Sequence, residues 1–209
     1  MKKNIVIFAS GTGSNFVNIY QKIKFKNLDA KICLLISNNP ECGAVNFASS
    51  NKIDVYIYNN KIYPNDLDQL LLLRKLDAYN IDLILLAGYM KKISSSIIKK
   101  FKNKIMNIHP SLLPLYGGKG FYGMRVHNAV FKNKDQESGA TVHFVDYGYD
   151  TGPILMQEKI KIELGEGIDA IAKKVLNIEH KIYFEAVELF CNNKIYWNNN
   201  KPLIKRIKN

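Results

Sequence analysis

The stretch KNIVIFASGTGSN, residues 3–15, joins a β-branched apolar run directly to a glycine-rich turn. A continuous apolar run that ends in glycine is typical of a central strand of a parallel sheet, because such a strand is buried on both faces. Phe16, Ile19, Tyr20 and Ile23 follow at helical spacing. The stretch therefore predicts a strand, a tight turn and a helix in succession.

The same alternation continues through the first half of the chain. Further strands are expected at 31–36, 53–58, 81–87 and 105–109, and further helices at 44–50, 66–79 and 94–101. Strands that alternate with helices form a parallel sheet with helices on both faces. We therefore expect an α/β fold with a doubly wound, mostly parallel, Rossmann-like sheet.

The pattern changes after residue 121. The sequence predicts a helix over 122–131, two strands over 140–145 and 154–162, and a long helix over 168–190. The two strands are joined through the turn-rich YGYDTGP, so an antiparallel or mixed pair is expected at the sheet edge. The tail, 194–207, is expected to carry a short hairpin or strand. No linker or repeat interrupts the chain, which predicts a single domain over 1–209.

The composition is that of a globular protein with an unusual charge. The chain has 209 residues, of which 47% are hydrophobic, and a net charge of +12. A basic chain suggests nucleic acid or a membrane surface. However, the lysines are scattered and only Arg74, Arg125 and Arg206 are arginines, whereas nucleic-acid readers cluster arginine. Since Lys, Asn and Ile share AT-rich codons, base composition accounts for the charge, and we expect no nucleic-acid partner.

Targeting signals are weak. No apolar run reaches the roughly 20 residues that span a bilayer, so no membrane partner is expected. The start, MKKNIVIFAS, resembles a signal peptide, but its apolar run is short and leads straight into the glycine turn. The three cysteines, Cys33, Cys42 and Cys191, form no CxxC pair and no even set, which fits a reducing compartment. We expect a cytoplasmic protein.

The turn SGTGSN, residues 10–15, offers a phosphate site. Its glycines permit a sharp turn, Ser14 and Asn15 can cap the helix, and free N–H groups at a helix start attract phosphate. A dinucleotide site would need glycine at Phe16 and an acid after the second strand, where Ser37-Asn38-Asn39 stand. The turn therefore favours a phosphate monoester over NAD, and an ordinary βα turn is the alternative.

The stretch IMNIHPSLLP, residues 105–114, places polar side chains where a strand leaves the core. Asn107 and His109 alternate with Ile108, so both can point the same way, and Pro110 ends the strand. Ligands of parallel sheets bind beyond the carboxyl ends of the strands. An amide donor beside an imidazole suits a developing oxyanion and proton transfer near neutral pH. The alternative is a strand-end histidine bonded to backbone.

HFVDYGYDTGP, residues 143–153, supplies an acid. We expect Asp150 to approach His109, to raise the pKa of its imidazole and to hold its orientation; the alternative is that Asp150 only shapes the turn. The four histidines, at 109, 127, 143 and 180, are spread widely without a cysteine pair, so we expect no metal. Ser111 lies in a proline-bounded turn, which favours direct transfer over a covalent intermediate.

SGTGSN, LAGYM (86–90), NIHPSLLP (107–114) and HFVDYGYDTGP occur in the order and spacing of the folate-dependent formyltransferases, which the chain resembles to about Phe190. SGTGSN and Glu179-His180 are similar to the branch that acts on glycinamide ribonucleotide. The resemblance implies formyl transfer from 10-formyltetrahydrofolate, as co-substrate, to the amine of glycinamide ribonucleotide in purine (IMP) biosynthesis. It implies a nucleotide-binding half (1–110), a catalytic and folate half (111–190) and a tail (191–209).

The resemblance also implies residue roles. Asn107 and His109 would stabilise the tetrahedral intermediate, and Asp150 would raise the pKa of His109 and help to move protons. The phosphate and ribose would be held by Gly13, Ser14, Asn15 and Glu179. The folate would contact Met90, Lys91, Lys92, Ile93 and Asn107. Apart from the resemblance, the glycine-rich composition of 115–130 predicts a lid over the site, in which His127 either faces the cleft or anchors the lid. We expect a monomer or weak homodimer.

Three other functions share parts of this pattern. Methionyl-tRNA formyltransferase would need a further basic C-terminal domain, and formyltetrahydrofolate hydrolase an N-terminal regulatory domain, and neither is expected here. A non-catalytic nucleotide-phosphate binding protein would keep SGTGSN but would have no use for Asn107, His109 and Asp150 together.

Overall fold

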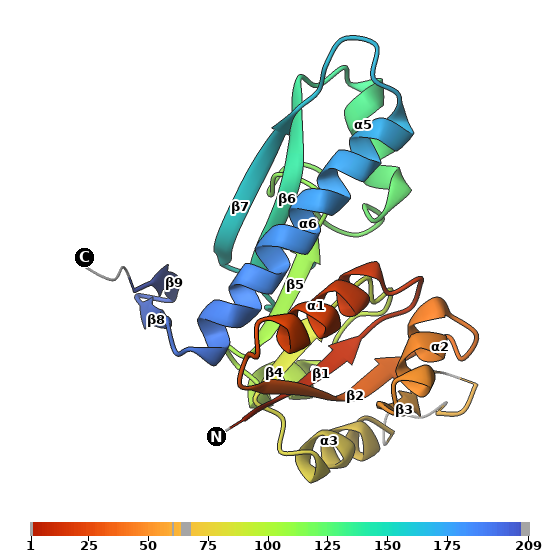
Figure 1. Ribbon diagram of the computed structural model, residues 1–209, viewed down its shortest axis with the longest axis vertical. Helices are drawn as coiled ribbons and strands as arrows, with labels where there is room; N and C mark the ends of the chain where they lie inside the picture. Colours follow the sequence, from red (N-terminus) through yellow and green to blue (C-terminus); the bar gives the residue numbers. More distant parts are fainter. Residues whose placement is uncertain (1, 60, 64–67, 206–209) are drawn as a thin grey trace. The chain divides into compact units, whose positions relative to one another are not determined.

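The computed structural model describes residues 2–59, 61–63 and 68–205. The chain divides into two compact units, one that ends at Met106 and one that begins at Asn107 (Figure 1). This division lies close to the boundary predicted after residue 110. The single-domain organisation stays a prediction.

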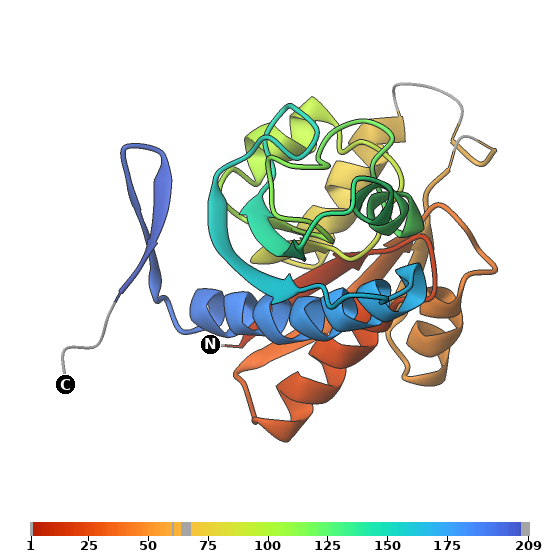
Figure 2. The same ribbon diagram turned by 90° about the horizontal axis from the view of Figure 1, so that it is seen from above.

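The first unit is a parallel α/β sheet. Its elements are β1 (Lys3–Phe8), α1 (Ser14–Phe25), β2 (Ala30–Ser37), α2 (Gly43–Ser50), β3 (Asp54–Ile57), α3 (Asp68–Ala78), β4 (Leu83–Leu86), α4 (Ser95–Lys100) and β5 (Ile105–His109), which continues into the second unit. The strand order is β3-β2-β1-β4-β5. β1 pairs in parallel with β2 and β4, and β2 with β3. Figures 1 and 2 show α1 and α2 on one face of these strands and α3 on the other.

The doubly wound fold is confirmed, and burial explains it. The four residues Ile5–Phe8 are fully buried, as are Leu83 to Leu85 in β4. These strands are covered on both faces, so their sequences are continuous apolar runs rather than alternating ones. The predicted start of α3 at Asp66 lies outside the described residues.

The second unit continues the order as β5-β6-β7, with β6 (Glu137–Phe144) and β7 (Ile154–Lys161) antiparallel. This confirms the predicted antiparallel edge. The helix α5 (Met124–Lys132) precedes β6, and α6 (Ile168–Cys191) lies along β6 and β7 (Figure 1).

A hairpin of β8 (Ile195–Asn198) and β9 (Lys201–Ile204) follows α6. The ring of Trp197 in β8 packs edge-on against Phe144, with the ring centroids 4.8 Å apart. The predicted tail hairpin is thus found, although Ile207, the predicted end of that tail, lies outside the described residues. Within the described part of the chain, no helix is long and apolar enough to cross a membrane.

Candidate active site

The carboxyl end of β5 and the loop after β6 meet in the second unit. His109 Nδ1 lies 3.6 Å from Asp150 Oδ2, and Asn107 Nδ2 lies 3.4 Å from Asp150 Oδ1. The period-2 alternation of β5 therefore turns both side chains toward one carboxylate. The sequence-based expectation that Asp150 approaches His109 is confirmed.

Asp150 is the centre of this cluster. Its side chain is only 14% exposed, and its Oδ2 accepts a 2.9 Å hydrogen bond from the Gly118 N–H. The neighbouring Asp146 shapes the loop instead, because its Oδ1 accepts from the Gly148 N–H at 3.0 Å and from the Thr151 hydroxyl at 2.7 Å. The two acids of the loop thus have different partners, and the carboxylate of Asp150 is the one that faces the histidines.

The environment of Asp150 keeps it ionised. Burial alone would raise the pKa of its carboxyl, but the nearby rings of His143 and His109 and the N–H of Gly118 outweigh burial. The pKa of Asp150 is therefore lowered from its ordinary value. A fixed negative charge consequently stands beside His109 at neutral pH.

His109 is buried, with 4% of its surface exposed. Its Nε2 lies 2.8 Å from the carbonyl oxygen of Tyr116. A carbonyl can only accept, so Nε2 carries a proton and donates it, and the neutral ring has its lone pair on Nδ1. Nδ1 is thus the atom that can gain or lose a proton.

Burial and the charge of Asp150 have opposite effects on the pKa of His109. Burial lowers the pKa of the imidazole, and this effect exceeds the raising effects of the Asp150 charge and the Tyr116 carbonyl. Asp150 acts in the predicted direction but is outweighed, because removing water penalises the charged ring more than one carboxylate favours it.

His143 completes the cluster, and sequence analysis left it out of the site. Its Nδ1 donates to the carbonyl of Phe144 at 3.0 Å, so in the neutral ring Nε2 accepts from Asn107 Nδ2 at 3.1 Å. His143 Nε2 also lies 3.6 Å from Asp150 Oδ1. A histidine at the end of β6, seven residues before the acid, was the available signal. The amide nitrogen of Asn107 is thus engaged by His143, and its contact with Asp150 is the longer of the two, at 3.4 Å.

The loop that carries Asp150 depends on Gly152. A Cβ at this position would lie 1.8 Å from the carbonyl oxygen of Phe144, which is backbone and unable to move aside. Gly152→Ala is expected to lower the free energy of unfolding by about 1–3 kcal/mol, as overpacking does. Urea denaturation measures it, with Gly11→Ala as the matched control because a Cβ there meets nothing within 4 Å. Equal stability of the two variants would contradict this account of the loop.

The turn Ser10–Asn15 lies in the first unit, and its cap differs from the prediction. The N-cap of α1 is Gly13, in the left-handed region with φ 79°, rather than Ser14 or Asn15. A Cβ on Gly13 would lie 2.9 Å from the Cβ of Ala44. Glycine therefore serves both the turn and the close approach of α2. The start of α1 has no side-chain oxygen at its cap position, which suits an anionic ligand. The role of Gly13, Ser14 and Asn15 stays a prediction.

The segment Met90–Ile93 is tied to the same turn. The Ser10 hydroxyl accepts from the Met90 N–H at 2.9 Å and donates to Asn38 Oδ1 at 2.5 Å. Met90 is 51% exposed, Lys91 and Lys92 are exposed, and Ile93 is buried. Apolar surface at Met90 beside exposed lysines fits an aromatic ligand with carboxylates, although the folate contacts stay a prediction.

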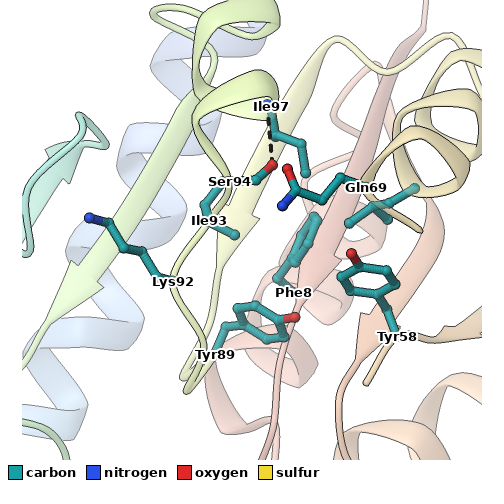
Figure 3. A pocket seen from close by; sticks show the side chains of 9 residues that line it. Phe8, Tyr58, Gln69, Tyr89, Lys92, Ile93, Ser94 and Ile97 are labelled. Atoms are coloured by element: carbon teal, nitrogen blue, oxygen red, sulfur yellow. Dashed lines mark hydrogen bonds between the residues drawn. The ribbon is translucent and has the colours of Figure 1, made fainter. Parts of the chain in front are cut away.

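Figure 3 shows a pocket beside this segment, with a volume of about 100 Å³. The rings of Phe8, Tyr58 and Tyr89 face it from one side and the Gln69 amide and Ser94 hydroxyl from the other. Phe8 and Tyr89 pack edge-to-face, with ring centroids 5.1 Å apart. The pocket is lined by Phe8, Tyr58, Gln69, Leu72, Tyr89, Lys92, Ile93, Ser94 and Ile97.

Three remaining expectations concern the second unit and metal. Glu179 lies on α6 and is buried, and its role at the ribose stays a prediction. His127 is 5% exposed, and its Nδ1 has no hydrogen-bond partner among the described residues. Over residues 2–59, 61–63 and 68–205, no group of three or more His, Cys, Asp or Glu side chains could hold a metal ion.

Comparison with known proteins identifies the family. The family model described as formyl transferase matches residues 3–187, which is most of the chain. The chain belongs to the formyl transferase family. The matched range of this formyl transferase contains Asn107, His109, His143 and Asp150, so the whole cluster lies inside the family's domain.

Relatives of this formyl transferase carry a more specific name. Phosphoribosylglycinamide formyltransferase of Vigna unguiculata, a chloroplastic protein, is 41% identical over all of this chain and 67% of its own length. The Bacillus subtilis enzyme of that name is 34% identical over 92% of this chain and 97% of its own. The solved structure of phosphoribosylglycinamide formyltransferase from Coxiella burnetii matches with a TM-score of 0.89 and 29% identity, over 98% of this chain and 94% of its own.

Proposed function

We propose that this formyltransferase transfers the formyl group of 10-formyltetrahydrofolate to the amine of glycinamide ribonucleotide. The products are formylglycinamide ribonucleotide and tetrahydrofolate, in purine (IMP) biosynthesis. The observation that carries the proposal is the convergence of Asn107 and His109 on Asp150 at the carboxyl end of β5. Relatives named phosphoribosylglycinamide formyltransferase, which match 100% and 92% of this chain, support the choice of acceptor.

The chemistry requires one proton to move. The acceptor amine forms a bond to the formyl carbon and loses a proton, and the bond from that carbon to the folate nitrogen breaks as this nitrogen gains a proton. His109 Nδ1 is placed to take the first proton and return it to the leaving nitrogen, because Nε2 is held by the Tyr116 carbonyl. Its lowered pKa keeps the ring neutral and able to act as a base near neutral pH.

Charge on the formyl oxygen needs a donor. Asn107 Nδ2 donates to His143 at 3.1 Å and makes only a long, 3.4 Å contact with Asp150. The hydrogen of that long contact is the one that turns to the oxyanion. Asp150 stays ionised, and its charge stabilises the imidazolium that forms on His109.

The binding groups follow the family assignments. The phosphate is held by the N–H groups at Gly13, Ser14 and Asn15, and Glu179 binds near the ribose. The folate packs against the segment Met90–Ile93 and Asn107. We infer a cytoplasmic monomer or weak homodimer that binds neither nucleic acid nor a membrane. The three cysteines form no CxxC pair, which is consistent with a reducing compartment.

The test is turnover with defined acceptors. The protein is incubated with 10-formyltetrahydrofolate, and the folate absorbance is followed. Three conditions are compared: glycinamide ribonucleotide, ribose phosphate, which has the phosphate but no acceptor amine, and water alone. Turnover that requires glycinamide ribonucleotide and yields its formyl derivative is the expected result. Turnover with water alone would indicate a hydrolase, and ribonucleotide binding without turnover would indicate a binding protein. Either result overturns the proposal.

A further inference from the structure

The segment Tyr116–Gly118 contacts both ionisable groups of the proposed site. The carbonyl of Tyr116 accepts from His109 Nε2 at 2.8 Å, and the Gly118 N–H donates to Asp150 Oδ2 at 2.9 Å. Two backbone groups, two residues apart, therefore hold the imidazole and the carboxylate whose Nδ1 and Oδ2 stand 3.6 Å apart. The relative placement of His109 and Asp150 depends on the conformation of this segment.

The backbone at Tyr116 is one that needs support. Its φ is 53°, in the left-handed region, which costs free energy for a residue with a Cβ. Gly117 next to it is also constrained, because a Cβ there would lie 2.6 Å from Leu113 Cδ2 and 3.4 Å from Asp150 Cβ. A tyrosine retained in this conformation requires contacts that stabilise it.

The phenol of Tyr116 makes those contacts. Its hydroxyl donates to Asp135 Oδ2 at 2.5 Å and accepts from Asn133 Nδ2 at 2.7 Å, both just after α5. The ring also packs edge-on against Phe121, with the centroids 6.0 Å apart. The side chain thus ties the segment to the end of α5 and fixes the direction of the carbonyl that faces His109.

We propose that Tyr116 is a positioning residue that fixes the tautomer and orientation of His109 through its backbone carbonyl, anchored by the Asp135 and Asn133 contacts of its phenol. The inference rests on the proposed role of His109. With the carbonyl in place, Nε2 keeps its proton and Nδ1 exchanges one. Without it, a neutral ring gains more by moving the proton to Nδ1, where Asp150 accepts it, and Nδ1 is then no longer a base.

The variants separate the effect of the hydrogen bonds of the Tyr116 hydroxyl from the effect of its ring. Tyr116→Phe keeps the ring and removes both hydrogen bonds of the hydroxyl, and Asp135→Ala removes the acceptor. Asp135→Asn keeps an oxygen acceptor and is the conservative rescue. Tyr122→Phe is the matched control, because Tyr122 is 40% exposed on the same glycine-rich stretch and its ring stacks with Arg125.

Two measurements are made on the full chain. The first is kcat and KM for formyl transfer. The second is the nitrogen chemical shifts of the His109 imidazole without substrates, which report the tautomer directly. The titratable side chains that influence His109 in the second unit are Asp150, His143 and His127, so the shifts are followed across pH in every variant.

Tyr116→Phe and Asp135→Ala are expected to lower kcat by about 10- to 100-fold with unchanged KM values, the scale of a misplaced catalytic group. Both should move the His109 proton toward Nδ1, while Asp135→Asn and Tyr122→Phe keep the wild-type kcat and tautomer. A Tyr116→Phe variant in which His109 keeps the wild-type tautomer overturns the inference, even if kcat falls because part of the protein is unfolded. If the wild-type protein transfers no formyl group but the tautomer still shifts, the proposed function fails and the positioning role stands.

Discussion

His109→Ala is expected to lower kcat for formyl transfer by at least about 10²–10³-fold, because one side chain supplies both the proton relay and a charge beside the oxyanion. The proposed relay uses Nδ1, since the Tyr116 carbonyl holds Nε2 at 2.8 Å. Steady-state kinetics with saturating folate and ribonucleotide measure the loss. KM for the ribonucleotide should change little, because we propose that the phosphate contacts lie at Gly13–Asn15.

Asn107→Ala is the comparison variant. It removes a donor without removing the relay, so its kcat should fall by about 10²–10³-fold, the usual cost of one oxyanion donor. Alanine at 109 leaves the Tyr116 carbonyl and the Asp150 carboxylate without His109, so thermal unfolding is measured alongside. A His109→Ala protein that is folded and keeps more than about a tenth of the wild-type kcat would exclude His109 as the relay.

Much of the site could be predicted because it depends on short-range geometry. Asn107 and His109 alternate on a strand that proline terminates, and parallel strands present their carboxyl ends on one edge. The acid had to come from the loop after β6, and only Asp146 and Asp150 were available there. The structure separates these two through partners that no spacing rule predicts, namely the Thr151 hydroxyl for Asp146 and the Gly118 N–H for Asp150.

The parts that sequence reasoning missed depend on burial and backbone conformation. The net pKa of His109 follows from how much protein covers the ring, and a neighbouring acid gives only one of the opposing effects. Ser14 and Asn15 have good capping side chains, yet Gly13 takes the N-cap because the close approach of Ala44 leaves no room for a Cβ. The carbonyl of Tyr116 could not be predicted as a partner of His109, since its direction depends on a left-handed backbone.

Asp150→Asn is expected to lower kcat on the order of 10²-fold at neutral pH, within the range of acid–base effects. The negative charge raises the pKa of His109 against the larger effect of burial, so its removal lowers that pKa further. A smaller fraction of imidazolium then forms, and protons are returned more slowly to the leaving nitrogen. Because the free enzyme needs neutral His109, the acid limb of kcat/KM should move to lower pH in the variant. Kinetics from about pH 5 to about pH 9 measure it.

The pH dependence of the free energy of unfolding tests the charge of Asp150 independently of the kinetics. The folded-state pKa of Asp150 is lowered, so its contribution is present above the unfolded pKa of about 3.9 and is lost as pH falls through the folded pKa. His109 also has a lowered folded pKa, so its contribution is lost as pH falls below about 6.5. Asp150→Asn removes the loss of stability that comes from protonating Asp150. It extends to lower pH the loss that comes from His109, because His109 becomes still harder to protonate in the folded state. Urea denaturation of the wild type and the variant at neutral and acid pH separates these two pH ranges. In the kinetic experiment, a pH profile that Asp150→Asn leaves unchanged would show that Asp150 does not act on His109.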